Sequence, residues 1–273
     1  MAGWEDRGGW TVWAMDWVAR QYKHCYTMYW WHRMTSKDRW FSITRQTMEN
    51  IRRINEAKID NPVLKKKITS SNDFCVKSLV FSDDYFECFN HRKFRLVTDK
   101  ISSLNRTGIE TSTGEQIDAD VIIYATGFDT IKSAQSFRVE GRHGKSLESI
   151  WGGKPRAYKG ISVPDLPNYF TTFGPNTFGN NVLFMLDCSS NFISSAVAKL
   201  SKKKGRQSMC IKPKLYEEYN KKVREEVAKK TFSASDGGFY RDVEGFNWVL
   251  YPWPMQCYAW DTASCQQGDF DWT

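Results

Sequence analysis

The sequence contains no glycine-rich turn of the form GxGxxG anywhere in its 273 residues. Such a turn lets the backbone wrap around the pyrophosphate of a dinucleotide at the start of a helix. The chain therefore encodes no phosphate cradle of this kind. Internal repeats and low-complexity tracts are missing as well, and the composition is not that of a disordered chain.

Metal and disulfide signals are also missing. The seven cysteines form no CxxC pair, and their odd number argues against a disulfide framework, so we expect reduced and mostly buried thiols. The four histidines show no ligand spacing with cysteine or carboxylate, which argues against a zinc site.

Membrane and export signals are absent too. No apolar run is long enough to span a bilayer, and residues 1–6 have neither the basic start nor the apolar core of a signal peptide. We therefore expect a protein without a transmembrane segment and with a cytoplasmic location.

The composition indicates a globular protein with a large core, because hydrophobic residues make up 41% and aromatic residues 15% of the chain. The net charge of +8 is dispersed, apart from the lysine runs at 65–67 and 202–204. Short runs of this kind are typical of solvated helix ends. No pattern of aromatic and basic residues accompanies the charge, so we expect no nucleic-acid partner.

Several helices are predicted from apolar spacing. Residues 10–31 carry an aromatic stripe that favours core or an open interface over a membrane-surface helix. Residues 44–57 form a second amphipathic pattern, and Asn61 with Pro62 starts a short helix towards Lys67. Two longer helices are predicted at 181–200, ending near Gly205, and at 213–230.

The most informative stretch is residues 117–128, IDADVIIYATGF. Val121 to Tyr124 lacks polar alternation, which predicts a strand buried on both faces of a covered sheet. The small residues that follow let the backbone approach a ligand closely, although packing alone also explains them. Asp118 and Asp120 are interpreted as polar residues at the strand end.

Short strands are predicted on either side of this stretch. Residues 96–105, 109–113 and 117–124 indicate a β-meander, and Asp83 or Asp84 is expected to cap a helix that holds Tyr85, Phe86 and Phe89. Residues 168–173 predict another buried strand, followed by a loop that contains Gly174, Pro175 and Asn176.

Four blocks of sequence resemble the C-terminal half of class B flavin monooxygenases, the Baeyer–Villiger and flavin-containing monooxygenases. In order, they are residues 77–90 (KSLVFSDDYFECFN), 117–128, 151–161 (WGGKPRAYKGI) and 166–177 (LPNYFTTFGPNT). The resemblance extends from about residue 62 to 260. It implies FAD and NADP as cofactors and a small organic molecule as substrate.

The same resemblance implies roles for individual residues. Lys77 corresponds to a lysine that contacts the 2′-phosphate of NADPH, and Phe239 stands where many relatives carry a tryptophan over the nicotinamide. Cofactor-binding positions are further implied at the linker Ala125, Thr126, Gly127 and Phe128 and at the loop Gly174, Pro175 and Asn176. For Lys77, an ordinary exposed lysine remains an alternative, and for the other groups packing alone does.

Ser78 is the main departure from the family pattern, because it replaces an arginine that stabilises the peroxyflavin anion in the Baeyer–Villiger branch. Serine has no positive charge and cannot donate the two parallel N–H hydrogen bonds of a guanidinium group. No intact catalytic residue is therefore predicted in this chain, and oxidation of sulfides or amines is favoured over ketones.

Taken together, the sequence predicts an α/β protein: a partial doubly wound flavoprotein fold with two dinucleotide-binding domains and helical N-terminal and C-terminal segments. We expect a helical segment at 1–70, part of the NADP-binding domain at 71–128 and part of the FAD-binding domain with an aromatic tail at 129–273. The leading hypothesis is an inactive monooxygenase fragment that self-associates through exposed apolar edges. A non-catalytic, partner-binding protein is the alternative, and a nucleic-acid-binding module ranks third.

Overall fold

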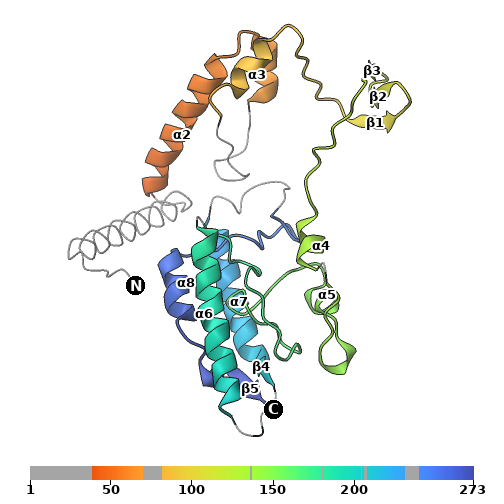
Figure 1. The fold of residues 1–273 in the computed structure, drawn as a ribbon. Helices are drawn as coiled ribbons and strands as arrows, with labels where there is room; N and C mark the ends of the chain where they lie inside the picture. The colour runs from red at the N-terminus through yellow and green to blue at the C-terminus, as the bar shows by residue number, and fades with distance from the viewer. Residues whose placement is uncertain are drawn as a thin grey trace, which may run out of the picture. The chain divides into compact units, whose positions relative to one another are not determined.

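The computed structural model describes residues 39–69, 82–135, 137–179, 181–203, 205, 208–230 and 240–273. The predicted aromatic helix at 10–31 lies outside these residues. The chain divides into two compact units (Figure 1), which are described separately. The smaller unit comprises Thr44–Asn72 and Ser78–Phe128, and the larger comprises Met1–Ile43, Asp73–Lys77 and Asp129–Thr273.

Two helices open the described part of the chain. α2 (Arg39–Ala57) confirms the predicted amphipathic helix, but its apolar residues Ile51 and Ile54 are 45% and 65% exposed. α3 (Pro62–Ile68) begins as predicted, because the Asn61 side chain accepts hydrogen bonds from the amides of Val63 and Leu64 and proline occupies the first turn.

A small antiparallel sheet confirms the predicted meander. β1 (Ile101–Leu104), β2 (Gly108–Thr111) and β3 (Gln116–Asp118) lie in the order β1-β2-β3. The strands are shorter than predicted. Asn105 Oδ1 accepts the amides of Thr107 and Gly108 and so fixes the first turn.

The predicted buried strand at 121–124 is wrong for the described structure. These residues are extended but belong to no sheet, and Val121, Ile123 and Tyr124 are 71–84% exposed. A strand exists only where a second segment pairs with its backbone, and the described residues provide no such segment here.

The segment before the meander forms a short 3₁₀ helix, η1 (Tyr85–Asn90), in place of an α-helix. Its cap also differs from the prediction, because the amide of Tyr85 donates to Ser82 Oγ and the Asp84 side chain caps no amide. Phe89 packs edge-on against Tyr85 and Phe94, and this aromatic contact holds the turn.

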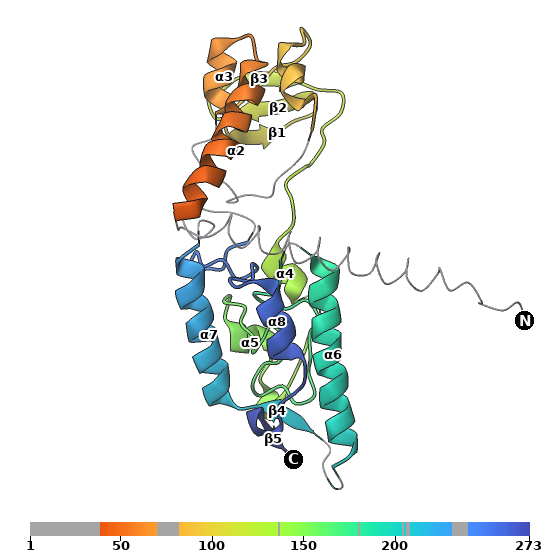
Figure 2. The ribbon, with the colours of Figure 1, turned by 90° about the vertical axis from the view of Figure 1, so that its left-hand side faces the viewer.

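The larger unit is mainly helical. α6 (Val182–Ser201) and α7 (Pro213–Ala228) confirm the two predicted long helices, and Asn181 caps α6 by accepting the amide of Phe184. α8 (Met255–Thr262) runs alongside α6 in both ribbon views (Figures 1 and 2). The shorter elements are α4 (Thr130–Ala134), η2 (Arg142–Gly144), α5 (Leu147–Trp151) and η4 (Gln267–Asp269).

A two-stranded antiparallel sheet joins the end of the chain to its middle. β4 (Met209–Ile211) pairs with β5 (Phe270–Trp272). Phe270 thereby enters a buried cluster with Phe192 of α6 and Tyr216 of α7. This cluster is the centre of the larger unit, because its members are almost fully buried.

The predicted buried strand at 168–173 is also wrong. Residues 167–168 form a turn in which Asn168 has a left-handed φ of 58°, and its amide and side chain both bond to Met209. Asparagine tolerates this conformation, which a continuous strand does not contain. Residues 168–173 therefore lie as a loop against β4.

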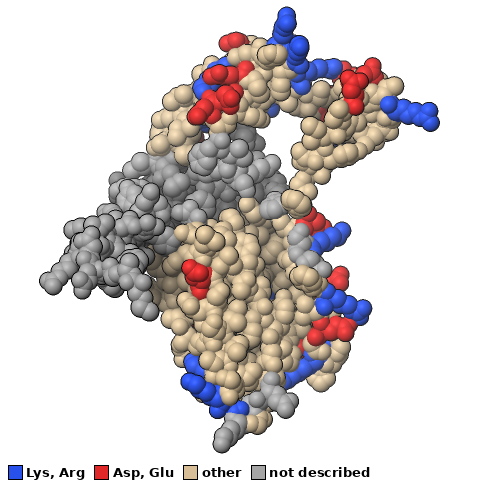
Figure 3. Space-filling view, in the orientation of Figure 1, with Lys and Arg blue, Asp and Glu red and all other residues tan. Residues whose placement is uncertain are grey.

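Apolar side chains also reach the surface of this unit. The view in Figure 3 shows few charged side chains over α6 and α8. Leu183 of α6 is 73% exposed and Trp260 of α8 is 77% exposed. Within the described residues, no helix is both long and apolar enough to cross a membrane.

Candidate functional site

The loop at residues 174–177 is pressed tightly against a second loop at residues 157–161. A Cβ atom on Gly174 would lie 2.1 Å from the carbonyl oxygen of Gly160. Thr177 closes the turn, because its Oγ1 donates to the Gly174 carbonyl at 2.6 Å. Glycine is thus required at position 174 by the protein's own backbone.

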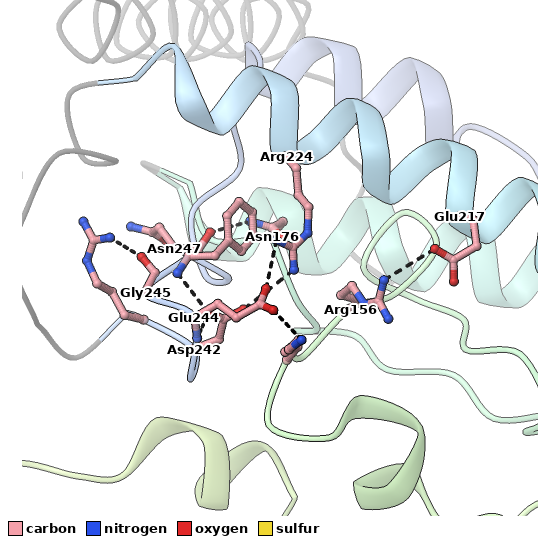
Figure 4. A network of polar contacts seen from close by, with 11 residues as sticks. Arg156, Asn176, Glu217, Arg224, Asp242, Glu244, Gly245 and Asn247 are labelled. Carbon is pink, nitrogen blue, oxygen red and sulfur yellow. Dashed lines mark hydrogen bonds and ion pairs between the residues drawn. The ribbon is translucent and has the colours of Figure 1, made fainter.

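Asn176 is the polar centre of this loop. It is 4% exposed and has a left-handed φ of 54°. Its amide nitrogen donates to the Trp248 carbonyl at 2.7 Å, and its Nδ2 donates to the carbonyls of Asn247 (3.1 Å) and Leu250 (2.9 Å). Figure 4 shows Asn176 and Asn247 facing each other. One side chain therefore fastens the aromatic tail to the loop.

The tail continues this pairing beyond Asn176. The amide of Phe178 donates to the Val249 carbonyl at 3.0 Å, and the amide of Tyr251 donates to the Phe178 carbonyl at 2.8 Å. Asn247 Oδ1 accepts the amides of Val249 and Leu250, which turns the tail back on itself. The loop and the tail thus form one hydrogen-bonded unit.

A charged network borders the tail (Figure 4). Asp242, whose side chain is 1% exposed, accepts the amides of Glu244 and Phe246 at 2.9 Å each. Arg224 lies 4.0 Å from Asp242 Oδ2 and 3.4 Å from Glu244 Oε2. Lys154 also pairs with Glu244, and its hydrogen bond is the main cause of the lowered pKa of that carboxyl group.

A cavity of about 360 Å³ lies beside this network. Val227 and Phe246 form its apolar wall, and Arg224, Arg241 and Glu244 contribute charge. The guanidinium of Arg224 lies over the Phe246 ring and pairs with Glu244, while Arg241 donates to the Gly245 carbonyl. The charged side chains that line the cavity therefore interact with other groups of this chain.

Buried phenols and a lysine form a second polar cluster in the larger unit. The Lys159 ammonium donates to the Asp261 carbonyl at 2.6 Å and lies over the Phe192 ring, and burial lowers its pKa. Tyr258 Oη donates to the Lys159 carbonyl at 2.9 Å, and burial raises the pKa of Tyr258. These contacts anchor α8 to the loop at 157–161.

Comparison with known proteins identifies relatives for most of the chain. No protein-family model matches it. An FAD-binding monooxygenase, ktnD of Aspergillus niger, is 32% identical over 217 residues, which cover 77% of this chain and 36% of the relative. A Baeyer–Villiger monooxygenase of Pseudomonas aeruginosa is 28% identical over 222 residues, which cover 78% of this chain and 42% of that protein.

Solved structures give the same result for the fold. A closed cyclohexanone monooxygenase structure matches with a TM-score of 0.76 and 20% identity, over 88% of this chain and 46% of that one. The chain is related to the class B flavin monooxygenases. It spans less than half the length of these relatives and corresponds to a portion like their C-terminal half.

The matched portion has a partial α/β flavoprotein fold. An oxidised steroid monooxygenase bound to NADP also matches, with a TM-score of 0.73 and 22% identity, over 88% of this chain and 46% of that protein. At this level of identity the likeness establishes the fold. The predicted fold class is thereby confirmed, and the curated relatives confirm the predicted resemblance.

The structure brings only some of the residues predicted as cofactor-binding into one place. Gly174, Pro175 and Asn176 lie in the loop held by the tail, and Pro175 and Asn176 are buried. Ala125 to Phe128 form an exposed stretch of the smaller unit. Gly127 has a φ of 80°, and a Cβ on it would meet nothing within 4 Å. Lys77, Ser78 and Phe239 lie outside the described residues.

The described residues do not by themselves make a cradle for a dinucleotide of a flavin monooxygenase. Gly174 faces the Gly160 carbonyl, and a Cβ on Gly179 would lie 2.4 Å from Met255 Sδ. The space beside both glycines is therefore filled by atoms of this chain and is not open to a ligand. Asn176 donates both of its described side-chain bonds to the tail. Of the two glycines predicted as cofactor-binding, Gly127 is the one at which a Cβ would meet nothing within 4 Å.

Other predictions concern metal and thiol chemistry. The part of the chain that the structure describes has no group of three or more histidine, cysteine or carboxylate side chains able to hold a metal ion. Cys188, Cys210 and Cys265 are free and buried, Cys88 is exposed and Cys257 is half-buried. Burial raises the pKa of Cys265 to about 11, so this thiol stays protonated at neutral pH.

The sequence interpretation missed the network around Asp242 and the clamp at Asn247. A local signal was present for Asp242, because aspartate followed by Gly245 is typical of a turn in which the carboxylate accepts nearby amides. No local signal exists for the bonds between Asn176 and the tail, which join residues more than 70 positions apart.

Proposed function

We propose that this chain supplies the C-terminal half of an FAD- and NADPH-dependent monooxygenase that inserts one oxygen atom into a small organic substrate. The observation that carries the proposal is the similarity to monooxygenases over more than two thirds of the chain. The oxygen chemistry in such enzymes is supplied by the bound flavin, and the protein binds and orients it.

Because this chain has no GxGxxG turn, we assign binding of the cofactor diphosphates to the N-terminal half of the enzyme and other cofactor contacts to this chain. FAD and NADP would bind with their diphosphates on a glycine-rich half, while this chain contributes Lys77 to the 2′-phosphate, the open backbone of residues 125–128 and Phe239 near the nicotinamide. The loop at 174–176 would act by holding the aromatic tail in position, because its own polar groups are engaged with that tail. The proposed domain boundaries are 1–70, 71–128 and 129–273.

Substrate preference is proposed from Ser78. A positive charge aimed at a developing anion in a dry site contributes roughly 3 kcal/mol or more. Without that charge, oxidation of a ketone to an ester loses about 100-fold in rate, since each 1.4 kcal/mol is a factor of ten. Sulfides and amines are therefore the favoured substrates.

The test is a full-length protein that joins this chain to the N-terminal half of a flavin monooxygenase relative. NADPH-dependent oxygen uptake is measured with a sulfide, an amine and a cyclic ketone, and the products are identified by chromatography. We expect sulfoxide or N-oxide from the parent and lactone only after Ser78→Arg. Ser78→Lys is the matched control, because it restores charge without the bidentate fork. A parent that converts the ketone as fast as Ser78→Arg contradicts the proposed preference.

A non-catalytic, partner-binding protein is the second candidate, favoured by the absence of every GxGxxG turn. The isolated chain is expected to be inactive and to lose FAD on gel filtration, because its sequence has no glycine-rich turn of the form GxGxxG to bring a helix N-terminus to the diphosphate. Self-association through exposed apolar residues and a cytoplasmic location also remain proposals. Stoichiometric flavin in the isolated chain would contradict the expected inactivity and favour an enzyme complete in itself.

A further inference from the structure

Five tyrosine and tryptophan rings of the larger unit contact one another in series. In the order of their contacts they are Tyr158, Tyr219, Trp253, Tyr251 and Tyr258. Successive ring centroids lie 5.4, 6.2, 5.5 and 5.3 Å apart. Aromatic rings that contact each other have centroids about 4.5–7 Å apart. The series therefore joins the loop at 157–161, α7, the aromatic tail and α8 through direct ring contacts.

Packing alone does not explain why these rings are oxidisable. Tyrosine and tryptophan lose a single electron far more readily than phenylalanine does. Tyr251 is 5% exposed, and its Oη has no hydrogen-bond partner among the described residues. A buried polar group without a partner costs about 1–3 kcal/mol, whereas phenylalanine would fill the same space without that cost. A redox role is one of the reasons for which proteins keep such a group.

Tyr158, at one end of the series, is paired with a base. Its Oη donates to Asp269 Oδ2 at 2.9 Å. A tyrosine that loses one electron becomes a strong acid, so a carboxylate at this distance can accept its proton. Burial raises the pKa of Tyr158, and the phenol therefore keeps its proton until an electron leaves. The Lys159 ammonium lies 5.1 Å from the ring centre, and the Asp269 carboxylate offsets this positive charge.

The phenol at the other end of the series has no such base. Tyr258 Oη donates to the Lys159 carbonyl at 2.9 Å and lies 2.9 Å from Ser189 Oγ. Neither a carbonyl nor a hydroxyl group accepts a proton at neutral pH. Tyr251 has no hydrogen-bond partner among the described residues. An oxidation that enters the series is therefore expected to settle on Tyr158.

We propose that these five rings form a relay that carries single-electron oxidations from the aromatic tail to Tyr158 and so protects the tail from radicals of partly reduced oxygen. The radical takes one electron from Trp253, which regains it from Tyr219, which in turn regains it from Tyr158. The O–H bond of Tyr158 breaks, its proton passes to the Asp269 carboxylate and a neutral tyrosyl radical remains. Ascorbate then gives one electron and one proton to restore the phenol, and Asp269 releases its proton to water.

The test oxidises the full chain with photo-oxidised ruthenium tris(bipyridine), with persulfate as the electron acceptor. Radicals are captured by a nitroso spin trap, and the adducts are located by peptide mass spectrometry. We expect an adduct at Tyr158 and little at Trp253 in the parent. In Tyr219→Phe the adduct at Tyr158 should be lost and the adduct at Trp253 should rise, because phenylalanine fills the space but is not oxidised by the probe.

Tyr216→Phe is the matched control for this variant. Tyr216 also lies on α7 and is buried, burial raises its pKa, and its Oη donates to the Arg156 carbonyl at 3.3 Å, but its ring is not part of the relay. The parent's adducts should therefore persist. Asp269→Asn is a second variant, which removes the base and should abolish the adduct at Tyr158. Asp271→Asn, at an exposed carboxyl group on β5, should leave that adduct unchanged.

Three results would overturn the proposal. One is a parent without an adduct at Tyr158. Another is an adduct at Tyr158 that reaches the parent's level in Tyr219→Phe or in Asp269→Asn, because the oxidant would then reach Tyr158 by another route. The third is an equal loss in Tyr216→Phe and Tyr219→Phe. The relay goes beyond the proposed function, and the test uses neither flavin nor NADPH, so a full-length protein without oxygen uptake would contradict the monooxygenase activity alone.

Discussion

Replacing Asn176 by alanine should loosen the aromatic tail from the larger unit. The change removes two buried hydrogen bonds, to the carbonyls of Asn247 and Leu250, and leaves both acceptors without another hydrogen-bond partner among the described residues. A buried unsatisfied polar group costs about 1–3 kcal/mol. Alanine at a φ of 54° adds about 1 kcal/mol, because it does not tolerate the left-handed conformation as asparagine does.

The expected loss is therefore about 3–7 kcal/mol, a large fraction of the 5–15 kcal/mol typical of a folded protein. Urea unfolding followed by circular dichroism measures it, and hydrogen exchange at the amides of Phe178 and Tyr251 reports the loop and tail directly. Asn176→Gly is the matched control, because it removes the same hydrogen bonds but relieves the backbone strain.

The glycine variant should be about 1 kcal/mol more stable than the alanine variant. If Asn176→Ala changes the free energy of unfolding by less than about 1 kcal/mol, the two hydrogen bonds do not hold the tail. If protection at Phe178 and Tyr251 survives in both variants, the tail is held by other contacts and the reasoning is refuted.

Two further predictions concern packing and pH. Gly174→Ala should destabilise the chain by about 1–3 kcal/mol, since its Cβ would lie 2.1 Å from the Gly160 carbonyl, whereas Gly268→Ala, with open space around it, should change stability little in the same thermal melts. Burial raises the pKa of Tyr216 to about 12, so its contribution is complete below pH 10 and falls by about 1.4 kcal/mol per pH unit between 10 and 12. Unfolding in urea at pH 9 and 11 should show a smaller loss of stability in Tyr216→Phe than in the parent; part of the loss remains, because other buried phenols such as Tyr258 also have raised pKa values. Tyr85→Phe, at a half-exposed phenol, should lose as much as the parent. Equal losses in the parent and in Tyr216→Phe would contradict the assignment.

The helices were predictable because their signals are local. Asn181 and Asn61 cap the amides that follow them, and Pro62 and Pro213 occupy first turns. The meander was predictable for the same reason, since Gly108 and Gly114 mark its turns. The strands of the meander are shorter than predicted, because each strand ends where the neighbouring strand no longer pairs with its backbone.

The two wrong strands share a physical cause. An apolar run indicates that a segment is suited to a β-sheet. A strand also needs a second segment that pairs with its backbone, and the apolar run does not specify where that segment lies. Val121 to Tyr124 has no strand partner among the described residues, and Asn168 turns the other run into a loop against β4. The clamp at Asn176 was not predictable either, because its acceptors lie more than 70 residues further along the chain.

The pairing of β4 with β5 has a consequence for how the larger unit is made. Ser208 and Thr273 are hydrogen-bonded across 65 residues, and Phe270 fills the cluster around Phe192. A ribosome adding about 5–20 residues per second needs roughly 3–13 s to synthesise that interval. Until Phe270 has been made, the apolar residues of α6 and β4 lack the side chain that completes their cluster, and such transiently exposed apolar surface makes a nascent chain prone to aggregation.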